Sequence, residues 1–168
     1  MEALYESAFL RIFASWEVFQ EDATIRMMAG AGTLAYKPVP ALGSSIYGSM
    51  KAARVALYGN RPYLLWHNPE GVVNRVAKVL DGSPLEAELA ANKSKLEHYG
   101  NVRHRVAHGS EDAATKFKAA SQYLTGVIHN GSPGKLLRSQ DMTDSLNLRR
   151  WISVITADLQ SVAAKCVL

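Results

Sequence analysis

The sequence predicts an all-α fold, a helical bundle of five to six helices. Apolar residues recur at intervals of three and four positions, capping residues precede several of these segments, and no segment alternates convincingly between apolar and polar residues. The chain has 168 residues, of which 48% are hydrophobic and 20% are charged, as is typical of a globular protein. This length suits one domain, so we expect residues 1–168 to form a single helical domain.

The first predicted helix covers residues 4–28 and has the most regular pattern in the chain. No proline or glycine interrupts it before Gly30. Its apolar positions recur every three or four residues, so they share one face of the helix. These positions are Leu4, Ala8, Ile12, Phe13, Trp16, Phe19 and Ala23. We expect the core, and not a base-stacking surface, to hold the aromatic residues Phe9, Phe13, Trp16 and Trp151.

A long loop is predicted next, because residues 30–45 are rich in glycine, proline and serine. It runs into a weaker predicted helix over residues 42–58, in which two glycines lower the helix propensity. A third helix is predicted from Asn68 to about residue 80. Asparagine is a favoured N-cap, and Pro69 fits the first helical position because proline lacks the amide hydrogen that would be unpaired there.

The clearest helix start lies at Ser83. Serine caps a helix, Pro84 suits its first turn, and Glu86 can complete a capping box with Ser83. The apolar residues that follow predict one continuous helix to about residue 107.

Gly109 is predicted to end that helix in a left-handed conformation. Ser110 is then expected to cap a further helix that reaches about residue 128, with two acidic residues in its first turn. Residues 129–134 predict a turn because they are rich in glycine, serine and proline. A last helix is predicted over residues 143–167 from its apolar spacing.

Charge and cysteine content limit the surroundings of the protein. The net charge of +4 and the isoelectric point near 9.2 favour contacts with polyanions such as nucleic acid. Cys166 is the only cysteine, so no disulfide can form within the chain, and the simplest compartment is a reducing cytoplasm. The N-terminal segment lacks the pattern of a signal peptide, and no apolar run approaches the length of a membrane span. We therefore expect a cytoplasmic protein that has no membrane partner.

The segment NVRHRVAHGSED, residues 101–112, contains two arginines and two histidines within six positions, and these are the main candidates for a functional site. Arg103 can hold a phosphate by charge-assisted hydrogen bonds, and His108 can move a proton near neutral pH. On an ideal helix these two residues lie about 140° and about 7.5 Å apart, so a site that contains both needs a loosened last turn beside Gly109. The alternative is that the arginines are solvated helix charges and His108 is a polar cap.

A metal site is the third interpretation of this segment. His104 and His108 are four residues apart and share a helical face, but no carboxylate or cysteine clearly completes a set of metal ligands. The sequence therefore predicts neither a metal nor any other cofactor. His98 precedes the segment and could line the same cleft.

The segment from Arg103 to Gly109 resembles the R-x4-6-H motif of the HEPN superfamily, whose members often read R-N-x-I-A-H-G. His104 fits the polar position after the arginine. Residues 1–28 resemble the long first helix of the bacterial RiboL-PSP-type branch of this superfamily, including an acid near the middle, here Glu17. Residues 63–80 are similar to the same branch. The resemblance extends over most of residues 1–125 and implies a HEPN-like helical bundle.

The resemblance implies a metal-independent endoribonuclease, with a composite site at the interface of a homodimer. HEPN enzymes of this kind act in toxin–antitoxin and other bacterial defence systems, so an antitoxin or another defence protein is an expected partner, beside the RNA substrate. Arg103 and His108 would be the catalytic pair and His104 a supporting residue. Glu17 would be a partner of Arg103, although a surface glutamate fits the sequence equally well.

The expected reaction is attack of the ribose 2′-OH on the adjacent phosphorus, which leaves a 2′,3′-cyclic phosphate and a 5′-OH. His108 would move the proton, and Arg103 would stabilise the negative charge on the phosphoryl oxygens. Basic side chains around the motif could follow the RNA backbone, although solvated helix faces would show the same pattern. They are Lys93, Lys95, Arg105, Lys116 and Lys118.

Two other classes of protein remain open from the sequence. The first is a catalytically inactive HEPN-like module that binds RNA or a protein partner, since the superfamily includes such members. The second is a plain helical interaction protein in which the motif has arisen by chance.

Overall fold

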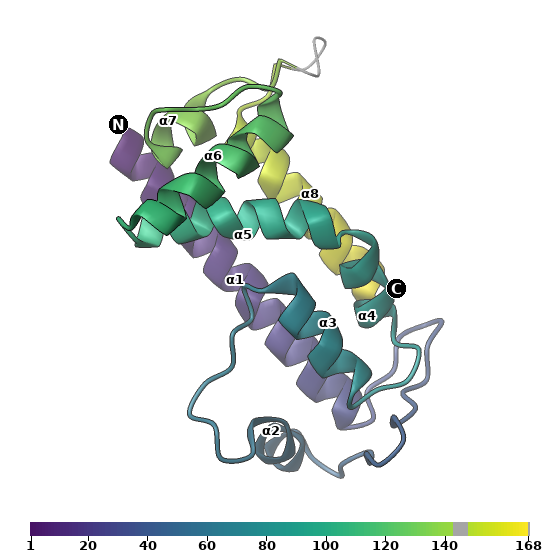
Figure 1. Ribbon diagram of the computed structural model, residues 1–168. Coiled ribbons are helices and arrows are strands. Elements are labelled where there is room, and N and C mark those ends of the chain that lie inside the picture. The colour runs from purple at the N-terminus through teal and green to yellow at the C-terminus, as the bar shows by residue number, and fades with distance from the viewer. Residues whose placement is uncertain (143–147, 168) are drawn as a thin grey trace. The chain divides into compact units, whose positions relative to one another are not determined.

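The computed structural model describes residues 1–142 and 148–167. Within these ranges the chain folds into eight helices, and the only β-type pairings are isolated bridges, Pro40 with Leu80 and Gln140 with Arg150. The all-α prediction is confirmed, with more helices than the five to six expected (Figure 1). The helices are α1 (Glu2–Met28), α2 (Met50–Tyr58), α3 (Pro69–Ala77), α4 (Pro84–Ala91), α5 (Lys93–Ala107), α6 (Glu111–Thr125), α7 (Pro133–Arg138) and α8 (Trp151–Val167).

The chain forms two compact units. The first unit contains Met1–Ser15 and Ser94–Gln160, and the second contains Trp16–Lys93 and Ser161–Leu168. Helices α1 and α8 therefore contribute residues to both units. Whether residues 1–168 act as a single domain stays a prediction.

The first unit has an apolar core. As predicted, the aromatic residues Phe9, Phe13 and Trp151 are buried. Other helices of the unit add the buried residues Tyr99, Val102, Phe117, Leu136, Leu137 and Ile155. The start of α1 also holds α7, because the Glu6 carboxylate accepts a hydrogen bond from the Gly134 amide at 2.9 Å. Beside it, the Ser132 hydroxyl donates to the Glu2 carboxylate.

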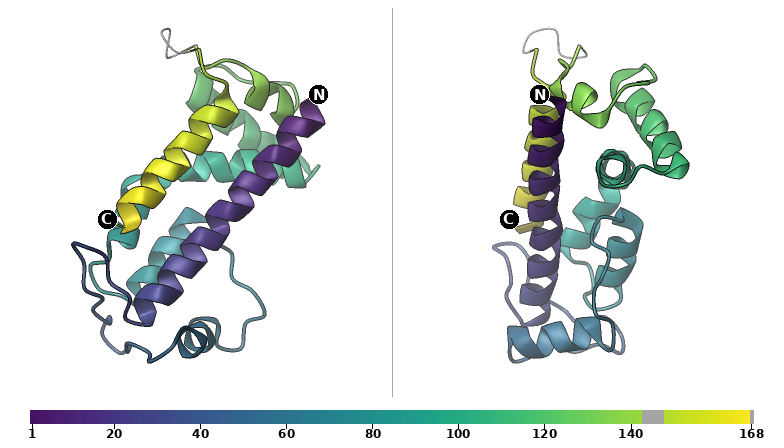
Figure 2. Two further views of the ribbon diagram at one scale, coloured as in Figure 1. Left: turned by 180° about the vertical axis from the view of Figure 1, so that it is seen from behind. Right: turned by 90° about the vertical axis from the view of Figure 1, so that its left-hand side faces the viewer.

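In the second unit, Trp16 is buried, again as predicted. The buried side chain of Gln20 donates a hydrogen bond to the Trp66 carbonyl at 2.9 Å, which ties α1 to the irregular segment before α3. Helix α3 packs against α4. The predicted loop is present: residues 31–49 connect α1 to α2 without a helix (Figure 2).

Side-chain caps start three of the six predicted helices at the expected residues. Asn68 Oδ1 accepts a hydrogen bond from the Gly71 amide at 3.2 Å, and Ser83 Oγ accepts one from the Glu86 amide at 3.1 Å. Ser110 Oγ caps α6 in the same way, with the Ala113 amide as donor at 3.2 Å. These bonds satisfy amides that would otherwise lack a partner at the helix start, so the caps fix where the helices begin.

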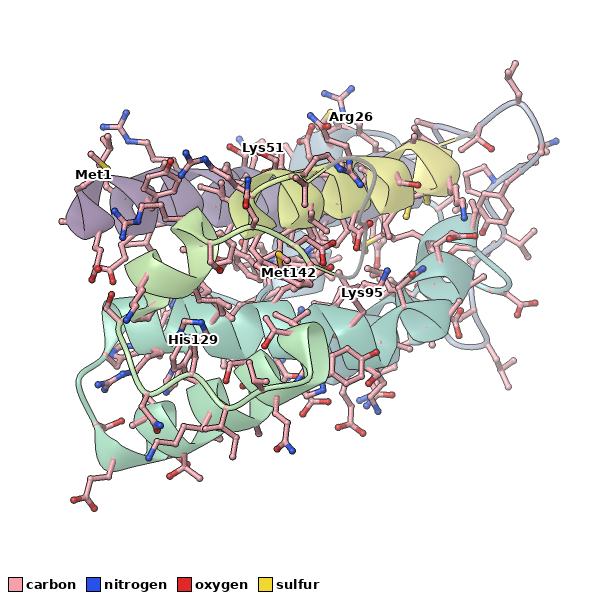
Figure 3. The ribbon with its side chains drawn as sticks, turned by 90° about the horizontal axis from the view of Figure 1, so that it is seen from above. Met1, Arg26, Lys51, Lys95, His129 and Met142 are labelled. Atoms are coloured by element: carbon pink, nitrogen blue, oxygen red, sulfur yellow. The ribbon has the colours of Figure 1, made fainter. Side chains whose placement is uncertain are left out.

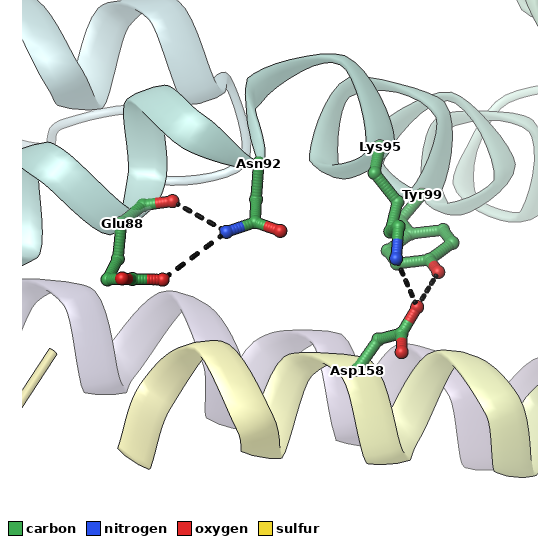
Figure 4. A network of polar contacts seen from close by, with 5 residues as sticks. All are labelled: Glu88, Asn92, Lys95, Tyr99 and Asp158. Atoms are coloured by element: carbon green, nitrogen blue, oxygen red, sulfur yellow. Dashed lines mark hydrogen bonds and ion pairs between the residues drawn. The ribbon is translucent and has the colours of Figure 1, made fainter. Parts of the chain in front are cut away.

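The helix predicted to be continuous from residue 83 to 107 is instead divided at Asn92 into α4 and α5. The Asn92 side-chain amide donates to the Glu88 carbonyl at 2.9 Å, and the Asn92 backbone leaves the helical region with φ −104° and ψ 9°. Asparagine competes in this way with the regular helical hydrogen bonds. Figure 4 shows this contact between Glu88 and Asn92.

Other element boundaries also differ from the predictions. Helix α2 begins at Met50 and not near residue 42, because Ser49 caps it there, and α3 ends at Ala77 and not near residue 80. Helix α6 ends at Thr125 and not near residue 128, because Gly126 takes a left-handed conformation with φ 76°. The turn predicted over residues 129–134 contains the start of α7, which Ser132 caps. Helix α8 begins at Trp151, and the first part of the helix predicted from residue 143, residues 143–147, lies outside the described residues.

Gly109 is not left-handed, which corrects the predicted helix stop. The glycines with positive φ are at positions 30, 43, 59, 82 and 126. A Cβ added at Gly109 would meet no atom within 4 Å. Helix α5 ends at Ala107, and Ser110 has extended backbone angles, φ −66° and ψ 158°, where it caps α6. Along residues 1–142 and 148–167, no helix combines the length and apolar character needed to cross a membrane.

Candidate functional site

The junction of α5 and α6, in the first unit, gathers most of the predicted site residues. Helix α5 ends at Ala107, and α6 starts at Glu111 after the Ser110 cap. His104 lies half-buried in the last turn of α5, and His108 is exposed directly after the helix. The short connection therefore brings the end of one helix close to the start of the next.

Two imidazole rings lie side by side at this junction. The ring centroids of His104 and His108 are 4.6 Å apart, with an angle of 51° between the rings. Asp112 Oδ2 lies 4.0 Å from His104 Nε2 and 2.8 Å from Lys116 Nζ. The junction thus combines two proton-transfer groups with one carboxylate and one ammonium group, a set that can accept and donate protons beside a bound anion.

The pKa of His104 is lowered from its ordinary value. Partial burial is the main cause, and the positive charges of His108, Lys116 and Arg103 add to it, whereas Asp112 acts in the opposite direction. A lowered pKa keeps the imidazole neutral at pH 7, because burial and neighbouring cations both disfavour its charged form. His104 can therefore accept a proton at neutral pH.

The two arginines of the motif differ in their surroundings. Arg103 is half-buried on α5. Arg105 Nη1 donates to the Ser110 carbonyl at 3.3 Å, so this guanidinium group lies back over the connection to α6. Both add positive charge to the junction, and guanidinium groups suit the planar oxygens of a phosphate.

The expected loosening of the last turn of α5 is not found in its hydrogen bonding. The His108 amide donates to the His104 carbonyl at 2.9 Å, which is the regular helical bond. The backbone bonds of α5 therefore stay regular to its end, and on an ideal helix positions 103 and 108 are about 140° apart. That the two act as a catalytic pair stays a prediction.

The predicted supporting residues fall in different places. Lys116 belongs to the junction through its ion pair with Asp112. Lys118 is exposed two positions further along α6, and two positions turn a helix by about 200°, so Lys118 faces away from Lys116. Lys93 forms an ion pair with Glu70 at 3.3 Å in the second unit. Glu17 also lies in the second unit, on α1, and its pairing with Arg103 stays a prediction.

Lys95 takes part in a separate polar network of the first unit. Its Nζ lies 3.0 Å from Asp158 Oδ2, and Figure 3 shows the Lys95 side chain on the side of α5 toward α8. The Tyr99 hydroxyl donates to the same carboxylate oxygen at 2.6 Å (Figure 4). Burial is the main cause that raises the pKa of Tyr99, and the hydrogen bond to Asp158 adds to it. Lys95 therefore ties α5 to α8 and is not part of the junction.

Sequence reasoning missed two acids. Asp112 is one of the two acids predicted in the first turn of α6, and its position four residues after His108 is a signal for a contact with the histidines. Asp158 was not singled out, although it is the only acid in α8. An acid within an apolar helical pattern is a signal for a buried or half-buried partner.

His98 is the remaining histidine on α5. Its ring stacks on Tyr123 of α6, with centroids 4.0 Å apart, and its Nδ1 is buried without a hydrogen-bond partner. Burial lowers its pKa. It lies seven residues before Arg105, so the two share a helical face. Among the described residues, no group of three or more histidine, cysteine, aspartate or glutamate side chains is placed to hold a metal ion.

Comparison with protein-family models, with curated proteins and with solved structures found no match for this chain. The class that the fold and the junction define is accordingly an all-α protein with a histidine- and cation-rich helix junction.

Proposed function

We propose that this protein is a metal-independent endoribonuclease of the HEPN type and that its site lies at the α5–α6 junction. The observation that carries the proposal is the pair of adjacent imidazoles, His104 and His108, with ring centroids 4.6 Å apart among the cations of the junction. His108 is exposed, so a substrate can reach it. The R-x4-H spacing of Arg103 and His108 supports the same class of protein.

The reaction uses the 2′-OH of the RNA as nucleophile. The bond from O2′ to phosphorus forms while the bond from phosphorus to O5′ breaks, which leaves a 2′,3′-cyclic phosphate and a 5′-OH. One imidazole takes the proton of the 2′-OH, and a protonated imidazole gives a proton to O5′. Neutral His104 can take the proton, and His108 is the second imidazole of the pair. The guanidinium group of Arg103 stabilises the charge on the phosphoryl oxygens.

The protein acts as a homodimer in this proposal, because Arg103 and His108 of one α5 leave the helix in different directions. A second copy related by a two-fold axis brings a second motif to the same cleft. The biological setting that goes with this class is a toxin or defence effector, with an antitoxin or another defence protein as its partner.

The test is cleavage of a single-stranded RNA by the purified protein in EDTA. Wild type is expected to release fragments with 2′,3′-cyclic phosphate ends, and His108→Ala and Arg103→Ala are each expected to cut about 10²- to 10⁴-fold more slowly. Mass spectrometry of the products identifies the ends. The same strand with 2′-O-methyl groups should stay intact, since its nucleophile is blocked.

Matched controls separate chemistry from folding and charge. His129→Ala removes a histidine outside the motif, and Lys118→Ala removes a positive charge from the far face of α6; both should cleave as wild type does. Circular dichroism confirms that each variant is folded. Equal cleavage by wild type, His108→Ala and Arg103→Ala would refute the catalytic assignment.

The alternative function is an RNA-binding module without catalysis, or a module that binds a protein. The regular last turn of α5 favours it, because the His108 amide keeps its helical bond and the loosened turn expected for a catalytic pair is absent from that bond. In the same assay this alternative predicts RNA binding by wild type and by both variants, with no cleavage by any of them.

A further inference from the structure

A groove of about 440 Å³ opens in the second unit beside the start of α3. This volume falls within the usual range of sites for small molecules. The residues that line it are Arg61, Pro62, Tyr63, Leu64, Leu65, Asn68, Gly71 and Arg75. Two features distinguish the groove, namely a pair of guanidinium groups and an exposed apolar wall.

The guanidinium group of Arg75 is held in place. It lies over the ring of Trp66, 4.7 Å from the ring centroid, and its Nη1 donates to the Leu65 carbonyl at 3.4 Å. Burial lowers the pKa of Arg75, and the positive charge of Arg61 lowers it further. The two guanidinium groups are therefore close enough for their charges to interact. Two neighbouring cations repel, and an anion between them removes that repulsion.

No acid in the wall of the groove neutralises these arginines. None of the described lining residues is acidic. Glu21, on α1, lies 2.8 Å from the guanidinium group of Arg54, and Glu70, on α3, lies 3.3 Å from Lys93 Nζ. The wall also includes the first turn of α3, where the positive end of the helix dipole favours an anion.

The apolar wall is open to solvent. Tyr63 is 69% exposed and Leu65 is 50% exposed, although both line the groove. An exposed aromatic ring beside a basic groove provides a surface on which a nucleobase stacks, and such stacking tolerates every base because each has a flat face. The chemistry of the groove is therefore that of a phosphate joined to a flat apolar group.

We propose that this groove binds a nucleotide, with the phosphate between Arg61 and Arg75 and the base against Tyr63. Guanidinium groups hold phosphate oxygens in pairs of parallel hydrogen bonds, which places the phosphate. The nucleotide is either a free mononucleotide or one unit of an RNA strand. The inference concerns the second unit and does not depend on cleavage at the α5–α6 junction.

Calorimetry on the whole protein tests the inference with two probes, adenosine 5′-monophosphate and an RNA hexamer that carries 2′-O-methyl groups. The hexamer is not cut through a 2′-OH, so its binding is measured whether or not the protein is a nuclease. Arg61→Gln is expected to weaken both probes about tenfold or more, because a charge-assisted contact is lost. Lys51→Gln removes one positive charge from α2 in the same unit and should leave binding unchanged.

Two further variants separate the parts of the ligand. Tyr63→Ala is expected to weaken adenosine 5′-monophosphate and to leave the weaker binding of inorganic phosphate as it is. Arg75→Lys keeps the charge but loses the planar pair of donors, so it should weaken both nucleotide probes. If the hexamer binds more tightly than the mononucleotide, the natural ligand is an RNA strand. If the two bind equally, the natural ligand is a free nucleotide.

The proposal fails if wild type binds neither nucleotide probe, or if Arg61→Gln binds both as wild type does. Loss of binding in Lys51→Gln equal to that in Arg61→Gln would also overturn it, since net charge alone would then account for the effect. This experiment measures binding and not cleavage. Its failure would therefore not contradict the proposed nuclease, and a protein that does not cleave RNA could still bind a nucleotide in this groove.

Discussion

His104 is the residue whose titration reports most directly on the α5–α6 junction. Its lowered pKa follows mainly from burial and then from neighbouring positive charges, against the pull of Asp112. NMR titration of its ring protons should therefore give a pKa below the ordinary value of about 6.5. Lys116→Ala should raise this pKa, because it removes a cation, and Asp112→Asn should lower it further, because it removes the one carboxylate.

The same shift links the junction to stability. The pKa of His104 in the folded state lies below that in the unfolded state, so the unfolded chain binds more protons just below the ordinary pKa. The stability that neutral His104 contributes is present above that pKa and is lost as the pH falls through the folded-state value. Lys118→Ala is the charge-matched control, and an unchanged His104 titration in Lys116→Ala would contradict the assignment.

The candidate site residues were easier to predict from the sequence than the groups with which they form hydrogen bonds and ion pairs. The spacing of Arg103, His104 and His108 directed attention to the junction. The partners of Glu2 and Glu6 could not be predicted: their carboxylates accept hydrogen bonds from the Ser132 hydroxyl and the Gly134 amide. Glu6 and Gly134 are 128 positions apart, and a contact over that distance leaves no periodic signal in the sequence.

At the element scale, α7 depends on a close approach of backbone to α1. A Cβ added at Gly134 would lie 2.5 Å from the Glu2 carbonyl oxygen, so one of the two backbones must shift. Gly134→Ala is therefore expected to lower the free energy of unfolding by about 1–3 kcal/mol, the usual cost of overpacking. Denaturation in urea measures the change.

Gly109→Ala is the matched substitution for this prediction. Its Cβ would meet nothing within 4 Å and its backbone is not left-handed, so the alanine should be neutral or stabilise by up to about 1 kcal/mol. Equal destabilisation by Gly109→Ala and Gly134→Ala would show that the contact between α7 and α1 is not the cause.

Helix starts were predictable because their caps are local. Asn68, Ser83 and Ser110 each bond to an amide three residues ahead, and the sequence shows both partners. Helix α7 carried the same signal, Ser132 followed by Pro133, but the neighbouring glycines led to a predicted turn. The break at Asn92 was harder to predict, since an asparagine within a helical pattern either faces solvent or bonds back to the chain.

At the scale of the whole molecule, the all-α class followed from helical periodicity, from the capping residues and from the lack of an alternating strand pattern. The division into two compact units did not, because α1 and α8 run through both units with an uninterrupted helical pattern. The sequence predicted which segment, residues 101–112, holds the candidate site. It did not predict how the side chains of that segment lie relative to one another. The contact of His104 with Asp112 depends on how α6 follows α5, which helical periodicity does not give.

The dimer of the proposed nuclease gives a prediction for two inactive variants mixed together. On an ideal helix positions 103 and 108 are about 140° apart, so in this proposal a complete site takes Arg103 from one copy and His108 from the other. A mixed dimer of Arg103→Ala and His108→Ala then holds one complete site and one empty site. Random exchange makes half of the dimers mixed, so the mixture should recover about a quarter of wild-type cleavage.

The measurement is the rate of RNA cleavage by the mixture after the subunits have exchanged, with native mass spectrometry to count mixed dimers. Each variant alone at the same total concentration sets the background. The double variant Arg103→Ala/His108→Ala mixed with either single variant is the control, because no arrangement of those chains completes a site. If mixed dimers form and cleavage stays at the background, the two residues act within one copy. Catalysis would then require the last turn of α5 to open at His108, against the hydrogen bond that closes it here.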